Sequence, residues 1–148
     1  MDTTSTQSSD QLFTSITQVG IVVRDVDECV SNYEKIFGKD SFVVVEGEGE
    51  ATLADGRDVT IKGKLGFCQL GPIQLELIQI LDGQSCHVDF LRENGEGIHH
   101  VATEVTDLDK EIEKYREQGI GLLQRGRSLR RYAYMDTKPI ILELIENS

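Results

Sequence analysis

The feature that most constrains this chain is an internal repeat. Residues 16–33 (ITQVGIVVRDVDECVSNY) align with residues 98–115 (IHHVATEVTDLDKEIEKY) without a gap, at a constant offset of 82 (98 minus 16). The tetrapeptide Leu-Glu-Leu-Ile then occurs at residues 75–78 and again at residues 142–145, an offset of 67 (142 minus 75). Two matches in the same order indicate that one structural unit has been duplicated.

The first copy, residues 15–81, reads as a strand, a helix and three further strands. β-Branched residues over 16–24 predict a strand, and Asp25 with Glu28 three positions later is typical of a helix start. Apolar residues at helical spacing follow, and Gly38 ends the helix. The rest of the copy is predicted to be a short strand, a mobile acidic loop and the two strands of a hairpin: residues 42–45, 46–58, 59–70 and 73–80.

The second copy, residues 98–148, repeats this plan with a helix over 107–118 that Gly119 ends. A connector at 82–97 joins the copies and is predicted to contain one short helical turn. The polar residues 1–14 are predicted to form a disordered tail. Because a single helix covers only one face of such a small sheet, two units must pair to bury or line the other face.

Composition excludes several classes of function. The formal net charge is -11, so a nucleic-acid backbone or an anionic membrane would repel the chain. No apolar run approaches the ~20 residues that a membrane span needs. The 3 cysteines are an odd number without close spacing, which argues against a disulfide framework. The N-terminus lacks the pattern of a secretory signal, so we expect a cytoplasmic protein.

Four polar residues occupy repeat-related positions. Gln18 and His100 lie two places after the opening isoleucine of each copy, and Glu76 and Glu143 lie inside the two Leu-Glu-Leu-Ile segments. Side chains alternate along a strand, so each glutamate projects from the face opposite its leucines. Such glutamates often point to solvent, but burying them requires a cation or a hydrogen-bond network.

An imidazole, two carboxylates and an amide oxygen are suitable ligands for a divalent ion such as Zn, Ni, Co, Mn or Fe. We therefore predict that Gln18, Glu76, His100 and Glu143 share one metal ion. The other two histidines are weaker candidates. His99 has the opposite parity to His100 and is predicted to face the helix layer, and His87 lies in the connector without a counterpart in the other copy.

These segments resemble the vicinal oxygen chelate superfamily, which includes glyoxalase I, methylmalonyl-CoA epimerase, extradiol dioxygenases and bleomycin-resistance proteins. QVGIVVRDVDECVSNYEKIFG is similar to the opening strand and helix of that family, and GEGIHHVATEVTDLDKEIEKYREQGI is similar to methylmalonyl-CoA epimerases. The resemblance implies an α+β fold of two paired βαβββ units, which form a cupped eight-stranded mixed sheet with the helices on its outer face. It also implies one metal ligand from each of the four positions above, and a homodimer.

The chain departs from individual relatives. Gln18 stands where epimerases and dioxygenases usually have histidine, and the ligand set resembles that of eukaryotic-type glyoxalase I. Val22 and Ile80 stand where that enzyme would contact glutathione through arginine and asparagine. The second carboxylate base of epimerases is absent from residues 63–66, where we expect its strand.

The resemblance favours a metal-dependent isomerase or lyase of the glyoxalase/epimerase type. Such an enzyme would abstract a proton next to a carbonyl through a metal-bound enolate, with Glu143, or otherwise Glu76, as the base. The substrate would be a small carbonyl compound or an acyl thioester. Two alternatives are a non-catalytic small-molecule binding protein of the bleomycin-resistance type and a metal-binding scaffold or sensor without turnover.

A cluster of arginines stands out in so acidic a chain: Arg125, Arg127, Arg130 and Arg131. It is predicted either to anchor a substrate carboxylate or the phosphates of an acyl-CoA, or to be a solvated hairpin rim.

Overall fold

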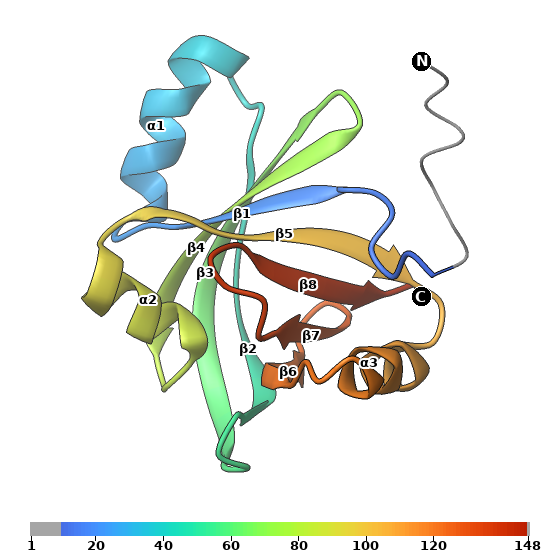
Figure 1. Cartoon of the computed structure of the whole chain (residues 1–148). Helices are drawn as coiled ribbons and strands as arrows, with labels where there is room; N and C mark the ends of the chain where they lie inside the picture. Colours follow the sequence, from blue (N-terminus) through green and yellow to red (C-terminus); the bar gives the residue numbers. More distant parts are fainter. Residues whose placement is uncertain (1–9, 148) are drawn as a thin grey trace, which may run out of the picture.

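The computed structural model describes residues 10–147, which form eight strands and three helices (Figure 1). The strands are β1 Gln18–Val22, β2 Val43–Leu53, β3 Asp58–Leu70, β4 Ile73–Asp82, β5 Gly97–Val105, β6 Leu122–Arg127, β7 Arg131–Met135 and β8 Ile141–Glu146. The helices are α1 Val26–Phe37, α2 Cys86–Asn94 and α3 Leu108–Glu117. Within this range no helix is long and apolar enough to cross a membrane.

The eight strands close into a barrel in the order β1-β4-β3-β2-β6-β7-β8-β5. Each half of this order is one predicted unit, because β1 pairs in parallel with β4 and β5 pairs in parallel with β8. The halves join through two antiparallel pairs, β1 with β5 and β2 with β6. The predicted α+β fold of two paired βαβββ units is therefore confirmed.

The predicted mobile loop at residues 46–58 is wrong, because β2 extends through most of it. In the β2–β3 ladder Glu46 lies opposite Lys64, and Glu48 lies opposite Lys62. Opposite charges across a ladder stabilise strand pairing, which offsets the weak strand propensity of the glycines. Only residues 54–57 form a turn.

The helix boundaries follow local signals in the chain. The Asp25 side chain accepts a hydrogen bond from the backbone N–H of Glu28, and Asp107 does the same for Lys110 at the repeat-related position. Gly38 follows α1 with φ 108, a left-handed conformation that favours glycine. The helical turn predicted in the connector is the longer helix α2.

The apolar core lies outside the barrel, between the sheet and the helices. One cluster packs Val26 of α1 against Leu77, and the equivalent cluster packs Ile112 of α3 against Leu144. Residues 1–9 of the predicted tail lie outside the described residues, but Leu12 packs against the α3 cluster. Because the core occupies the outer face of the sheet, the inner face is available for polar residues.

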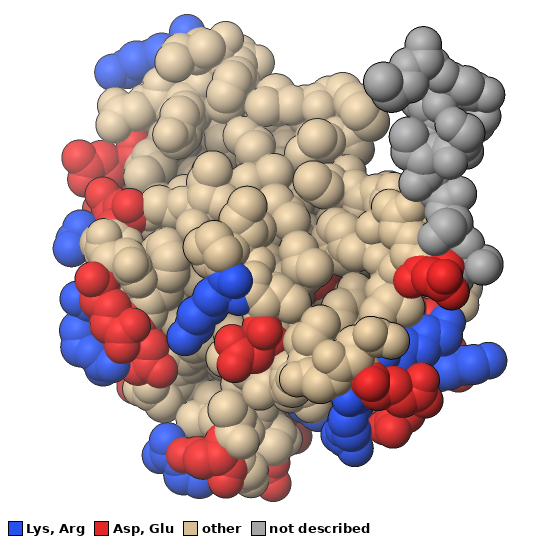
Figure 2. Space-filling model, in the orientation of Figure 1, with Lys and Arg blue, Asp and Glu red and all other residues tan. Residues whose placement is uncertain are grey.

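Most charged side chains lie around the periphery of the face shown in Figure 2, and basic and acidic side chains also lie side by side just below its centre. Acidic and basic groups alternate there, and its upper centre is uncharged. The face presents no basic patch of the kind that nucleic-acid binding requires.

Candidate metal centre

The strand register brings the four predicted ligands to the inside of the barrel. Gly20 of β1 is the Cα partner of both Glu76 on β4 and His100 on β5. Ala102 of β5 is the partner of both Gln18 and Glu143. The small residues Gly20 and Ala102 thus lie between the four polar side chains, which come from four adjacent strands.

Glu76, His100 and Glu143 converge on one point. The Nε2 atom of His100 lies 3.1 Å from Oε1 of Glu143 and 3.6 Å from Oε1 of Glu76. The side chains are 0%, 6% and 13% exposed for His100, Glu143 and Glu76, respectively. One ligand atom from each residue lies within 4.8 Å of the others, which is compatible with a shared ion.

Three buried polar atoms in this region make no hydrogen bond among the described residues: Gln18 Oε1, His100 Nε2 and Glu143 Oε1, of which the last two interact only as an ion pair. The amide nitrogen of Gln18 donates to Oε1 of Gln74 at 2.8 Å, so the unpartnered Gln18 oxygen is available as a ligand. Leaving such atoms unsatisfied is costly, whereas a divalent cation would be bound by all of them. These residues therefore fit a metal ion.

Burial and mutual proximity shift the pKa values of the ionisable groups in the centre. Burial alone would lower the pKa of His100, but Glu143 and Glu76 outweigh it and raise that pKa to about 9. Burial raises the pKa of the Glu76 carboxyl, and the nearby Glu143 adds to the rise. In the metal-free protein the imidazolium of His100 supplies the positive charge that these carboxylates need.

A hydrogen bond and the absence of a side chain on Gly20 determine the position of the His100 ring. Its Nδ1 atom lies 2.8 Å from Nδ1 of His99, and the two atoms share a hydrogen bond. A Cβ atom placed on Gly20 would overlap the ring, lying 2.6 Å from Nδ1 and closer still to Nε2. Glycine at position 20 is thus required for the imidazole to occupy this place.

Two adjoining cavities open beside the centre, with volumes of about 220 and 340 Å³. Glu76 and Glu143 line both of them, so the two carboxylates lie at the junction. The walls are largely apolar, with Ile61, Leu65 and Ile78 among the side chains that line the smaller cavity. Small-molecule sites commonly combine apolar walls with a few convergent polar groups.

Comparison with known proteins decides the family. The model of the Glyoxalase/Bleomycin resistance protein/Dioxygenase superfamily matches residues 17–134. The chain belongs to this superfamily. The predicted resemblance to vicinal oxygen chelate proteins is confirmed, because the similar structures include methylmalonyl-CoA epimerases, which are members of it.

Three relatives illustrate the likeness. The methylmalonyl-CoA epimerase of Mycobacterium tuberculosis is 26% identical with a TM-score of 0.68, over 98% of this chain and 95% of that one. A Streptomyces coelicolor methylmalonyl-CoA epimerase in complex with 2-nitronate-propionyl-CoA is 23% identical with a TM-score of 0.67, over 91% and 95%. The uncharacterized protein YqjC of Bacillus subtilis (strain 168) is 27% identical over 135 residues, which cover 86% of this chain and 89% of YqjC.

Two tyrosines that were not predicted from the sequence line the smaller cavity. Tyr134 on β7 is the ladder partner of Glu143, and Tyr132 lies two residues earlier on the same inward face. Burial raises the pKa of Tyr134 well above its usual value, and the nearby carboxylates add to the rise. Its hydroxyl lies 2.9 Å from Nε2 of His87. The alternation of residues 131–135 could have revealed both tyrosines once β7 was placed next to β8.

His87 and His99 are more central than predicted. His99 contacts Phe90 of α2, as a residue facing a helix would, but it also contacts Tyr134 and His100. A β-bulge breaks the simple alternation of faces along β5: the β1–β5 register shifts from Gly20–His100 to Ile21–Ile98 and skips His99. His87 lies at the start of α2 and lines the smaller cavity.

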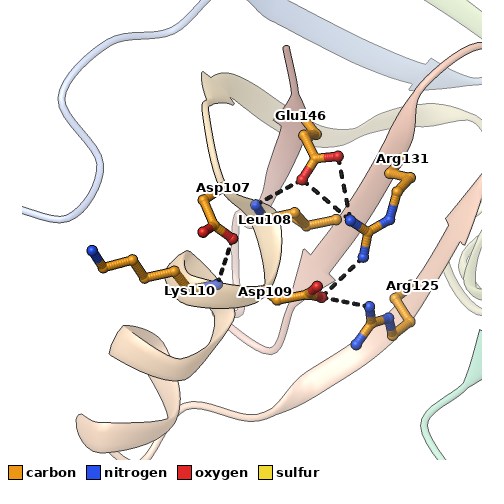
Figure 3. Close-up of polar contacts among 7 residues, drawn as sticks. All are labelled: Asp107, Leu108, Asp109, Lys110, Arg125, Arg131 and Glu146. Carbon is orange, nitrogen blue, oxygen red and sulfur yellow. Dashed lines mark hydrogen bonds and ion pairs between the residues drawn. The ribbon is translucent and has the colours of Figure 1, made fainter. Parts of the chain in front are cut away.

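The structure separates the four arginines. Arg125 and Arg131 both donate to Asp109 of α3, at 2.8 and 2.9 Å, on the helix side of the sheet (Figure 3). Arg131 also donates to Glu146, whose carboxylate accepts from the first backbone N–H of α3 (Figure 3).

Arg130 and Arg127 lie nearer the centre. Arg130 pairs with Glu104 at 3.2 Å and borders the larger cavity. Arg127 borders both the smaller cavity and a groove on the outer surface. A role as substrate anchor therefore suits Arg127 and Arg130 better than the two arginines held by α3.

Proposed function

We propose that the protein is a divalent-metal-dependent isomerase or lyase of the glyoxalase/epimerase type, which moves a proton next to a substrate carbonyl. The observation that carries this proposal is the convergence of Glu76, His100 and Glu143 at the junction of two apolar cavities. Membership of the superfamily and the likeness to methylmalonyl-CoA epimerases support an enzymatic role. A binding protein without metal would not need to bury two carboxylates and an imidazole against one another in this way.

Gln18, Glu76, His100 and Glu143 would hold the ion, whose identity among Zn, Ni, Co, Mn and Fe is open. When bound, such an ion polarises a carbonyl oxygen and stabilises negative charge on it. His100 and Glu76 would serve as ligands only, with no part in the proton transfer. The neutral amide of Gln18 keeps the net charge of the ligand set at -2, because only the two glutamates are anionic.

Glu143 is the proposed general base. Its Oε1 atom pairs with His100 Nε2 at 3.1 Å, and the residue lines both cavities, where a substrate carbon would lie. The opposite wall is formed by β2 and β3, whose alternating inward positions include Gly47, Gly49 and Gly63. Glu46 and Glu48 also border the smaller cavity, but strand alternation directs their side chains to the outer face, where Lys64 and Lys62 lie opposite them in the ladder.

This wall bears on the type of reaction. Epimerisation with two bases needs a proton donor on the face of the substrate opposite Glu143. The glycine-rich wall supports instead a transfer in which one carboxylate removes the proton and returns it. Both subclasses remain within the proposal, and the stereochemistry of the product distinguishes them.

The proposed substrate is a small carbonyl compound or an acyl thioester. The acyl-CoA analogue bound by the Streptomyces coelicolor relative supports the thioester. Arg127 and Arg130 border the two cavities and would pair with its phosphates.

Proton exchange tests the role of Glu143. Candidate α-keto compounds and 2-substituted acyl thioesters are incubated with the metal-loaded enzyme in deuterium oxide, and NMR records loss of the α-proton signal. Glu143→Gln is expected to abolish exchange while keeping bound metal through the remaining ligands. Glu113→Gln, an exposed change of the same type on α3, should exchange at the rate of the unaltered protein. Full exchange by Glu143→Gln refutes the proposed base.

A further inference from the structure

A second group of metal-ligand side chains lies beside the first, between α2 and β5. It consists of Cys86, His87 and His99, which offer one ligand atom each within 4.8 Å of one another. Cys86 and His87 are the first two residues of α2, and His99 lies in the β-bulge of β5. None of the three belongs to the ligand set proposed above.

Specific contacts hold this group in place. The backbone N–H of Cys86 donates to Oε1 of Gln124 at 2.9 Å, which ties the start of α2 to β6. The Ser85 hydroxyl accepts from the backbone N–H of His87 at 3.2 Å and lies 3.1 Å from its Nδ1 atom. The bulge turns His99 toward α2, where its ring contacts His87. The arrangement is therefore a defined structure, with both histidines buried.

One atom of the group has no role in the hydrogen bonding of residues 10–147. The Nε2 atom of His99 is buried without a partner, while the residue as a whole is 2% exposed. A buried ring nitrogen in this state is costly unless something binds it. The Cys86 thiol lies nearby, and the His87 ring would join it as a ligand by giving up the hydrogen bond between its Nε2 atom and the Tyr134 hydroxyl.

We propose that Cys86, His87 and His99 form a second metal site, selective for an ion such as Zn²⁺ that binds thiolate and imidazole. A thiolate with two imidazoles is a known zinc ligand set, and it differs from the oxygen-rich set of the first centre. The thiol loses its proton when the ion binds. His87 lines the smaller cavity, which gives the ion a path to the site.

Cobalt(II) provides a direct test, because a thiolate ligand gives a near-ultraviolet charge-transfer band that oxygen and nitrogen ligands do not. Titration of the metal-free full-length protein should develop this band, with metal content approaching two ions per chain at saturation. Cys86→Ser should lose the band and bind one ion. Cys29→Ser, which changes a cysteine on α1, should keep both.

Absence of the band from folded wild-type protein at saturating cobalt, or its persistence in Cys86→Ser, overturns the second site. Neither result depends on turnover, so they are independent of the outcome for the proposed enzyme.

Discussion

Gly20→Ala tests whether the position of the His100 ring determines metal binding. The added Cβ atom would lie 2.6 Å from Nδ1 of His100, whereas ordinary contacts begin at 3.4 Å. The ring must therefore move by at least 0.8 Å, the difference between these two distances. His100 is 0% exposed and contacts both His99 and Tyr134, so it cannot move without displacing them.

This displacement is large compared with what a metal site tolerates. Ligand distances in metal sites vary by only about 0.2 Å, and changes that misplace a ligand commonly reduce affinity by roughly 10–100-fold. Overpacking of a buried position also costs about 1–3 kcal/mol of unfolding free energy. For a chain of this size that corresponds to a fall of roughly 2–12 °C in Tm.

Metal affinity is measured by competition with a chromophoric chelator, and Tm is measured by circular dichroism. Gly97→Ala is the matched control, because a Cβ atom there meets nothing within 4 Å on the same pair of strands. It should retain affinity and Tm. If Gly20→Ala binds metal as tightly as the unaltered protein, His100 is not a ligand at this position and the reasoning fails.

Three further predictions concern protonation, packing and substrate contacts. The pKa of His100 in the metal-free fold is about 9, above its ordinary 6.5, so this group stabilises the metal-free fold fully below pH 6.5 and loses that contribution as pH rises to about 9. Metal must displace its proton, so the apparent affinity measured with the same chelator should rise with pH up to about 9. Leu144→Ala, at a side chain that is 0% exposed, should cost about 2–5 kcal/mol in urea denaturation; a loss below 1 kcal/mol would contradict its place in the core. Arg127→Ala should raise KM for an acyl thioester, whereas Arg125→Ala, whose side chain is held by Asp109, should leave KM unchanged; equal effects would reject Arg127 as the anchor.

Local signals in the sequence predict much of the secondary structure. Asp25 and Asp107 are N-caps because their side chains satisfy backbone N–H groups within three residues, a requirement that does not depend on the rest of the fold. Residues 46–53 show the opposite case. Their glycines and glutamates are typical of a loop, but the lysines of β3 make them a strand, and only the pairing of the two segments reveals that interaction.

The homodimer and the cytoplasmic location expected from the sequence stay predictions, as do the roles of the individual site residues. Metal analysis and the variants above address the site residues directly. The oligomeric state is a separate measurement by light scattering.

By itself the sequence determined the duplication and, through strand alternation, the shared inward orientation of Gln18, Glu76, His100 and Glu143. Both follow from periodicity along one chain. Only the tertiary structure decided what lies next to these residues: the β-bulge that turns His99 toward α2, the tyrosines opposite Glu143, and the separation of Arg125 from the cavity. The reason is physical, because these contacts join strands distant in sequence, and a shift of one residue in their register reverses which face a side chain occupies.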